Sequence, residues 1–276
     1  MSSLIAPRIR GRLALLAGAM AATVGLTLAG APNATATDAP AASTAAVSAS
    51  DVSAQAWPTP TSNQAVSATI SLSGNVDAGM RRYYGTGALG SGSQDEDQGP
   101  LLRLAPGTVL SNVIIGAPAA DGIHCEGACT LRNVWWEDVG EDAATFRGSS
   151  SSQQMLVDGG GARYASDKVF QHNGAGTLTI RNFEVRDVGK LYRSCGDCST
   201  QYTRHVVVEN VHVYPPIDQL VGININRNDT ARLRNITFHG DPDDFEACAK
   251  YRNTSQVGSG PDSTNCLYSA SDIHYQ

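Results

Sequence analysis

Several carboxylates stand close together in one short stretch of this chain. Two acidic pairs lie in the segment Trp136-Glu-Asp-Val-Gly-Glu-Asp142, and Asp121 precedes them in a separate segment. Carboxylates that cluster repel one another unless a cation lies among them, and hard oxygen ligands favour calcium. If the fold brings them together, Asp121, Asp138, Glu141 and Asp142 predict a calcium site. A solvated acidic turn is the alternative, and the spacing is not that of an EF-hand loop.

Basic residues follow this acidic segment at similar intervals. Lys168 comes directly after Asp167, and Lys190 and Arg193 lie together in a later segment. A lone Lys or Arg is usually a surface charge. Three of them at matching positions beside an acidic cluster predict a groove that binds an anion, with calcium recruited to the same place.

The elements that must position these side chains are short β-branched runs. Each run alternates apolar and polar residues, as half-buried strands do. The clearest runs are Val109–Ile115, Thr130–Trp136, Thr177–Phe183, Val206–Val213 and Ala231–Phe238. Long amphipathic helices are hard to find, so the pattern indicates an all-β fold.

One asparagine recurs in every run, before a hydrophobic residue. The five are Asn112, Asn133, Asn182, Asn210 and Asn235, with a weaker copy at Met155–Asp158 in the widest gap. A period in the twenties without helices predicts a β-solenoid with three short strands per coil, in which stacked asparagines bridge neighbouring coils. A β-sandwich with turn asparagines is the alternative. Solenoids offer a long lateral groove that suits an extended polysaccharide, although the fold does not choose among hydrolase, lyase and binding protein.

The N-terminal residues have the pattern of a targeting segment. Residues 1–36 combine a basic start, an apolar run and Ala34-Thr35-Ala36, which predicts a cleaved secretory signal peptide. The alternative is a membrane anchor, for which the run is short. Residues 37–56 predict a disordered Ala/Ser/Thr linker, and residues 57–276 a single domain. We therefore expect a secreted, extracellular protein with no membrane contact in its mature form.

Charge and cysteine content narrow the function further. The chain has 20 Lys plus Arg and 26 Asp plus Glu, and loss of residues 1–36 removes three Arg and no acid, which leaves a net charge of −9. An acidic protein is a poor candidate for nucleic-acid binding. Six cysteines behind a signal peptide favour disulfides, and nearness suggests Cys125–Cys129, Cys195–Cys198 and Cys248–Cys266. A zinc site at Cys195-Gly-Asp-Cys198 is the alternative.

Longer motifs resemble a known enzyme family. The segments are Ala120–Gly127, Asn133–Ala143, Asp167–Asn173, Gly189–Cys198 and Gln201–Asn210. In order and content they resemble pectate lyases of polysaccharide lyase family three, over nearly all of residues 57–276. The resemblance implies a single-domain right-handed parallel β-helix that requires calcium.

The resemblance also implies roles for individual residues. Calcium ligands are expected at Asp121, Glu141 and Asp142, with Asp138 nearby. Lys168, Lys190 and Arg193 are the expected catalytic cations. Arg147, where some relatives have Lys, and Glu96, in the early Gly/Ser-rich loop, are expected to bind substrate.

The expected reaction is β-elimination of α-1,4-linked polygalacturonate by a protein that we expect to be monomeric. Lys168 is the preferred base, with Arg193 as the alternative, and Lys190 supports the site. A neutral Lys168 is required, and Lys190, Arg193 and calcium are expected to lower its pKa. The alternatives are an inverting galacturonan hydrolase, whose Asn-Thr-Asp and Gly-His-Gly signatures are absent, and a non-catalytic pectin-binding solenoid.

Overall fold

A computed structural model describes residues 56–95 and 97–276. The predicted signal peptide, residues 1–36, lies outside the described residues. So do residues 37–55 of the predicted linker, and Glu96. No helix in the part of the chain that the structure describes is long and apolar enough to cross a membrane.

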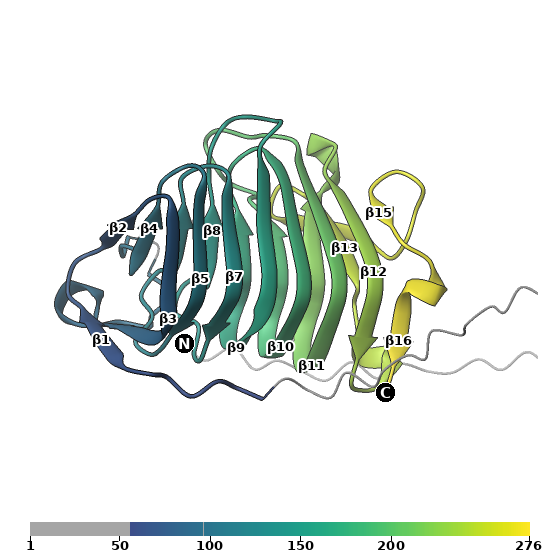
Figure 1. Ribbon diagram of the computed structural model, residues 1–276. Coiled ribbons are helices and arrows are strands. Elements are labelled where there is room, and N and C mark those ends of the chain that lie inside the picture. The colour runs from purple at the N-terminus through teal and green to yellow at the C-terminus, as the bar shows by residue number, and fades with distance from the viewer. Residues whose placement is uncertain (1–55, 96) are drawn as a thin grey trace, which may run out of the picture. The chain divides into compact units, whose positions relative to one another are not determined.

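The described residues form a stack of coils in which nearly all strands run parallel (Figure 1). The main path of paired strands is β1-β3-β5-β7-β9-β10-β11-β12-β15, and the one antiparallel strand pair of this region is β13–β14. This is the predicted all-β parallel β-helix, a solenoid of coils, which rules out the sandwich alternative.

The strands are β1 (Asn63–Val66), β2 (Ile70–Leu72), β3 (Asn75–Gly85), β4 (Leu102–Leu104), β5 (Thr108–Ile115), β6 (Ile123–Cys125), β7 (Cys129–Trp136), β8 (Ala144–Phe146), β9 (Gln154–His172), β10 (Gly176–Ser194), β11 (Arg204–Asn224), β12 (Thr230–Phe238), β13 (Cys248–Arg252), β14 (Ser255–Ser259), β15 (Cys266–Leu267) and β16 (Ile273–Tyr275). Four short 3-10 helices complete the described elements: η1 (Gly87–Leu89), η2 (Ile225–Arg227), η3 (Pro242–Asp244) and η4 (Ala270–Asp272).

Each of the five recurring asparagines lies at a bend of its own coil, and those on neighbouring coils form the predicted ladder. All five have left-handed backbone angles, with φ between 50° and 55°. Asn133 Nδ2 donates to Asn112 Oδ1 at 2.8 Å, and Asn235 donates in the same way to Asn210. Asparagine adopts this conformation more readily than most residues, and its amide both donates and accepts, so one residue type turns the chain and joins the coils.

Aromatic and aliphatic side chains fill the interior of the coils. Trp136, Phe146, Phe170 and Phe183 are at most 2% exposed and contact one another edge-on or tilted. The three disulfides suggested by sequence nearness are formed: Cys125–Cys129, Cys195–Cys198 and Cys248–Cys266. The zinc alternative at Cys195 and Cys198 is therefore wrong, because both thiols are oxidised in one disulfide.

Candidate functional site

One face of the coils gathers the predicted site residues from neighbouring strands. The sheet that carries them is built from β6, β8 and the C-terminal parts of β9, β10 and β11. Lys190 is paired in register with Lys168 on one side and with Gln219 on the other. Asp121 and Asp142 stand two residues before the paired positions Ile123 and Ala144, so acids and bases meet on adjacent coils.

Asp121, Glu141 and Asp142 converge, as predicted. Their ligand oxygens all lie within 4.8 Å of one another, and their exposed fractions are 6%, 3% and 2%. His124 Nε2 lies 2.5 Å from Asp121 Oδ2, and Thr145 Oγ1 donates to Asp142 Oδ2 at 3.4 Å. Three buried carboxylates at this separation form a donor set of the hard oxygen type that calcium prefers.

Two glycines let the coil turns approach closely enough for this convergence. Gly122 has a φ of 45°, and a Cβ there would lie 2.4 Å from the Asp142 carbonyl oxygen. A Cβ at Gly140 would lie 2.0 Å from the Ala120 carbonyl oxygen, which accepts a hydrogen bond from the Glu141 backbone N–H at 2.9 Å. Without side chains at these two positions, the turn that carries Asp121 packs directly on the turn that carries Glu141 and Asp142.

Burial and mutual repulsion raise the free energy of the folded protein when all three carboxylates are ionised. Burial raises the pKa of Asp142 well above its ordinary value, and the charges of Glu141 and Asp121 add to that effect. Burial likewise raises the pKa of Glu141. A bound cation would reverse the repulsion, because it favours the ionised form of every carboxylate around it. The residues therefore fit a calcium ion.

Lys168 lies against the cluster and is held by three carboxylates. Its Nζ is 3.3 Å from Glu141 Oε1, 3.7 Å from Asp142 Oδ1 and 3.0 Å from Asp167 Oδ2. Burial lowers the pKa of Lys168, but Asp142, Asp167 and Glu141 outweigh burial and raise it above the ordinary value. The protein groups alone therefore shift this pKa in the direction opposite to the expected lowering, because the carboxylates around Nζ outweigh the neighbouring cations.

Lys190 shares one of these carboxylates. Its Nζ donates to Asp167 Oδ1 at 2.7 Å, so Asp167 bridges the two lysines. Burial raises the pKa of Asp167, but the hydrogen bonds from Lys190 and Lys168 outweigh that effect and lower it. Asp167 thus fixes the separation of the two ammonium groups. Its place directly before Lys168 in the sequence could have suggested this.

Arg193, unlike Lys168, is surrounded by neutral hydrogen-bond acceptors. Its guanidinium donates to the Ser194 carbonyl at 2.6 Å, to Asn224 Oδ1 at 3.1 Å and to the Asn253 carbonyl at 2.6 Å. Its side chain forms no ion pair with a described carboxylate. Burial lowers its pKa, and none of these three acceptors cancels the charge of the guanidinium.

The Tyr251 ring packs against Arg193, a contact that the sequence did not predict. The Arg193 guanidinium carbon lies 3.9 Å from the centroid of the Tyr251 ring. The Tyr251 hydroxyl donates to Gln219 Oε1 at 2.7 Å, which fixes the ring in turn. A Cβ at Gly222 would lie 2.9 Å from Arg193 Cδ and 3.1 Å from Tyr251 Cε2, so glycine there leaves room for the stack. Tyr251 is distant in sequence from every motif, so no local signal could reveal it.

The remaining predicted residues lie outside the cluster. Asp138 is exposed and does not join the three converging carboxylates, because the next residue, Val139, packs into the core. Arg147 follows β8, with Nη2 at 3.4 Å from His124 Nε2 and Nη1 at 3.9 Å from Glu126. It therefore contacts the cluster only through His124. The position of Glu96 is not described.

Known proteins match this chain over most of its length. The pectate lyase family model matches residues 54–257. A probable pectate lyase F from Aspergillus terreus is 46% identical over 182 residues, which cover 65% of this chain and 77% of that protein. Pectate lyase H from Emericella nidulans is 45% identical over 201 residues, which cover 70% and 74%.

Solved structures of the same kind share the fold. The catalytic domain of pectate lyase PelI from Erwinia chrysanthemi is 33% identical, with a TM-score of 0.67, over 78% of this chain and 100% of that one. PelI has also been solved in complex with tetragalacturonic acid; that structure is 31% identical, with a TM-score of 0.63, over 77% of this chain and 70% of the other. The chain therefore belongs to the pectate lyase family, which corresponds to the polysaccharide lyase family three that its motifs resemble, and it is a pectate lyase.

Proposed function

We propose that this pectate lyase is a secreted, calcium-dependent and monomeric enzyme that cleaves α-1,4-linked polygalacturonate by β-elimination and releases unsaturated oligogalacturonides. The observation that carries the proposal is the buried group of Asp121, Glu141 and Asp142, which lies directly against Lys168. The relative solved with tetragalacturonic acid supports polygalacturonate as the substrate.

Asp121, Glu141 and Asp142 would hold the calcium ion. When bound, calcium supplies positive charge that stabilises the negative charge developing on the substrate carboxylate as the neighbouring proton leaves. The donor set supports this assignment, because burial and the nearby charge of Asp121 raise the pKa values of Glu141 and Asp142, and a shared cation would favour the ionised form of all three carboxylates. Asp138, expected near the metal, does not join the three converging carboxylates, and substrate binding by Glu96 stays a prediction.

Arg193 would bind the carboxylate of the reacting sugar. Its guanidinium is 9% exposed and already oriented by three acceptors and the Tyr251 ring, so little freedom is lost when an anion binds. Because none of its described partners is a carboxylate, its charge is not neutralised before substrate arrives. Lys190 would add positive charge beside it.

Lys168 would remove the proton from C5 of the sugar, and the C4 oxygen would then depart to leave a double bond. A charged ammonium accepts no proton, so this assignment requires the carboxylates around Nζ to be engaged elsewhere when substrate reacts. Glu141 and Asp142, two of the three, are the residues assigned to the metal. Arg193 is the alternative proton acceptor.

Secretion is supported by oxidised cysteines. All six pair in the structure, and such pairing persists in oxidising compartments outside the cytosol. The basic and apolar pattern of residues 1–36 supports the same route.

The ultraviolet absorbance of the product tests the reaction. Only a lyase creates a new carbon–carbon double bond, so polygalacturonate treated with the enzyme and calcium should gain absorbance in step with the loss of chain length. Verified removal of metal with a chelator should abolish the signal, and calcium should restore it. Full turnover in the chelator would exclude the calcium assignment, and new reducing ends without absorbance would indicate hydrolysis.

A further inference from the structure

A group of buried polar residues contacts Arg193. Asn224 is the last residue of β11, Asp229 directly precedes β12, and Ser194 is the last residue of β10. All three are 0% exposed. Buried polar groups destabilise a fold unless they are hydrogen-bonded, so the partners of these three residues indicate what the group does.

The Asp229 carboxylate holds the group together. Its Oδ2 accepts a hydrogen bond from the Ser194 hydroxyl at 2.6 Å and from the Asn224 backbone N–H at 3.0 Å, and its Oδ1 accepts one from the Arg204 backbone N–H at 2.9 Å. Burial raises the pKa of Asp229 more than these hydrogen bonds lower it. Because all three partners donate, they favour the ionised carboxylate. Asp229 therefore joins the ends of β10 and β11 to the start of β12.

The Asn224 amide carries this order to Arg193. Its Nδ2 donates to the carbonyls of Cys195 at 2.8 Å and Ser194 at 3.3 Å, and its Oδ1 accepts from Arg193 Nη1 at 3.1 Å. The reversed amide would place its NH₂ group against the guanidinium and its oxygen against two carbonyls, so only one orientation is satisfied. Asn224 thus holds both acceptors of Arg193 Nη1, because the second is the Ser194 carbonyl at 2.6 Å.

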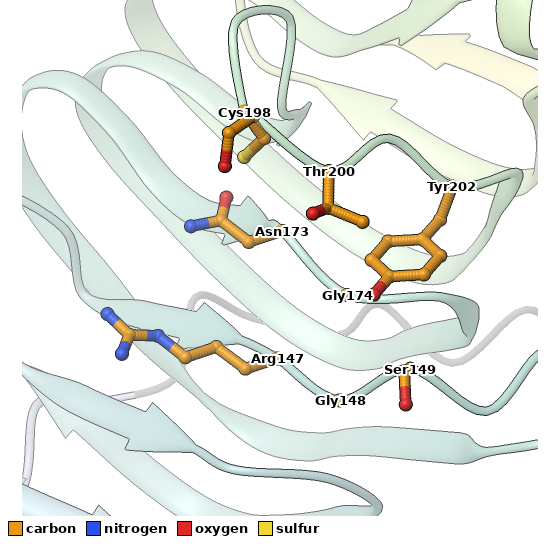
Figure 2. A pocket seen from close by; sticks show the side chains of 9 residues that line it. Arg147, Gly148, Ser149, Asn173, Gly174, Cys198, Thr200 and Tyr202 are labelled. Carbon is orange, nitrogen blue, oxygen red and sulfur yellow. The ribbon is translucent and has the colours of Figure 1, made fainter.

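The loop that follows Cys195 is fixed on its other side as well. Arg204 Nη1 donates to the carbonyls of Cys195 at 3.3 Å and Tyr202 at 3.4 Å, and the Cys195–Cys198 disulfide closes the first part of the loop. Figure 2 shows the rest of this loop, from Cys198 to Tyr202. The carbonyls that orient the Asn224 amide are therefore in place before any ligand binds.

The contacts of Arg193 leave one side of its guanidinium available. A guanidinium has five N–H donors. Nη1 makes two hydrogen bonds, to Ser194 and Asn224, and Nη2 makes one, to the Asn253 carbonyl at 2.6 Å. The Nε–H group has no partner among the described residues. The side formed by Nε and Nη2 therefore keeps donors for a carboxylate, which an arginine can bind through two parallel hydrogen bonds.

We propose that Asn224, Ser194 and Asp229 are positioning residues, which hold Nη1 of Arg193 so that its Nε and Nη2 side faces the substrate carboxylate. The inference rests on the proposed function in taking Arg193 as the group that binds this carboxylate. The three residues act only through the guanidinium. Asp229 also opposes the effect of burial on Arg193, because burial lowers the pKa of the guanidinium and the charge of Asp229 raises it.

The test is a double-mutant cycle measured on polygalacturonate with the calcium-loaded enzyme. Asn224→Ala removes one acceptor of Nη1 and frees the other, so KM should rise about three- to tenfold, the loss expected from one hydrogen bond, while kcat changes less. In the Arg193→Ala background, the same substitution should change KM by less than about twofold, because the guanidinium through which it acts is gone. Where turnover is too slow, the Kd of hexagalacturonate from calorimetry replaces KM.

A second variant tests the link to the buried carboxylate, and a matched asparagine provides the control. Ser194→Ala removes the hydroxyl that joins Asp229 to the strand of Arg193, so KM should rise by about threefold. Asn265→Ala removes a side chain that donates to the Asp229 backbone carbonyl at 2.8 Å and not to its carboxylate. It should lower the melting temperature and leave KM at the wild-type value.

The outcomes separate this inference from the proposed function. KM does not depend on how much of the enzyme is folded, so poor folding alone cannot imitate the effect. A wild-type KM in both Asn224→Ala and Ser194→Ala overturns the positioning role, as does an equal rise in KM when Asn224→Ala is made in the wild type and in Arg193→Ala.

A crystal structure of Asn224→Ala gives a readout that needs no substrate. The guanidinium of Arg193 should leave its place over the Tyr251 ring, and an unchanged guanidinium would contradict the inference. If Arg193→Ala alone left KM unchanged, the carboxylate-binding role proposed for Arg193 would fail, and this structure would still decide whether Asn224 positions the guanidinium.

Discussion

Lys168 and Arg193 are held in opposite ways, and this difference supports the different tasks proposed for them. Lys168 Nζ lies within 4 Å of three carboxylates, whereas the acceptors of Arg193 are carbonyl and amide oxygens. Carboxylate partners hold an ammonium in its charged form until they are withdrawn. Neutral partners orient a guanidinium without cancelling its charge. We therefore expect the protonation of Lys168 to depend on what binds the carboxylates around it, and Arg193 to pair with an anion.

Substitution of Lys168 distinguishes a proton acceptor from a simple positive charge. Lys168→Ala should reduce kcat by about 100- to 10,000-fold, the usual contribution of a positioned general base, with little change in oligogalacturonate binding. Lys168→Arg keeps the charge but raises the pKa, so its activity at neutral pH should stay low and recover in part in alkali. The measurement is the pH profile of kcat.

The control is Lys250→Ala, which removes a lysine that is paired with Asp262 at 2.6 Å, away from the charged cluster. It should keep the wild-type pH profile. Near-normal turnover by Lys168→Arg at neutral pH would transfer the base role to Arg193 or to a water molecule.

Tyr251 offers a second test at the scale of single residues, because its ring packs against Arg193, the residue proposed to bind the substrate carboxylate. A buried cation–π contact contributes about 2 kcal/mol, so Tyr251→Leu should lower kcat/KM by about tenfold or more through a raised KM. Tyr251→Phe keeps the ring and loses only the hydrogen bond to Gln219, and it should stay within about threefold of the wild type. Equal losses in both variants would show that the hydroxyl matters, and the stacking account would be wrong.

At the scale of elements, the sequence predicted the repeated coils, but it did not predict the contacts that occur only once in the fold. The period of the asparagines predicted the coils, because each coil needs the same left-handed bend and the same amide bridge. The register of Asp121, Asp142, Lys168 and Lys190 followed from that period. The position that matches Asn133 after the weaker copy at Met155–Asp158 is Gly159, with a φ of 79°. Glycine turns the chain there without a side-chain amide, so the asparagine pattern is interrupted.

Contacts between distant segments could not be predicted from the period. Tyr251 comes from β13, which pairs with β11 rather than with the strand of Arg193. Asp138 was expected near the metal because it lies in the acidic segment, but the side chain of Val139 is drawn into the core and leaves Asp138 exposed. The sequence shows which residues are charged, but burial and packing determine which charged side chains lie close together.

Gly140 provides an element-scale prediction about how coil turns create the acidic cluster. A Cβ at this position would lie 2.0 Å from the Ala120 carbonyl oxygen, so Gly140→Ala must push the two turns apart. Asp121 then moves away from Glu141 and Asp142, and the calcium-induced rise in melting temperature should shrink or disappear. Gly258→Ala is the control, since a Cβ there meets nothing within 4 Å. A normal calcium response in Gly140→Ala would contradict the packing argument.

For the whole molecule, net charge opposes the association of the protein with its substrate. After loss of residues 1–36 the protein would carry a net charge of −9, and its substrate is also an anion. Repulsion of this kind slows association unless the binding face is locally positive. Lys168, Lys190, Arg193 and Arg147 all lie on one face of the coils. The acidic cluster on the same face would become less negative when it holds a cation.

The acidic cluster should also make the stability of the whole domain depend on calcium and pH. Burial raises the pKa values of Asp142 and Glu141, so the folded protein holds protons that the unfolded chain releases. Without calcium, the free energy of unfolding should therefore fall as the pH rises above the ordinary carboxyl values of 3.8 and 4.5, until the raised pKa values are passed. Calcium at 100 times its dissociation constant should add about 2.7 kcal/mol to the free energy of unfolding.

Asp142→Asn removes one buried charge, so this variant should unfold at a higher temperature than the wild type in chelator and gain little stability from calcium. Thermal unfolding of both proteins, with chelator and with calcium between pH 4 and pH 8, measures both effects. A wild-type melting temperature that calcium leaves unchanged would show that these carboxylates are a structural cluster and not a metal site.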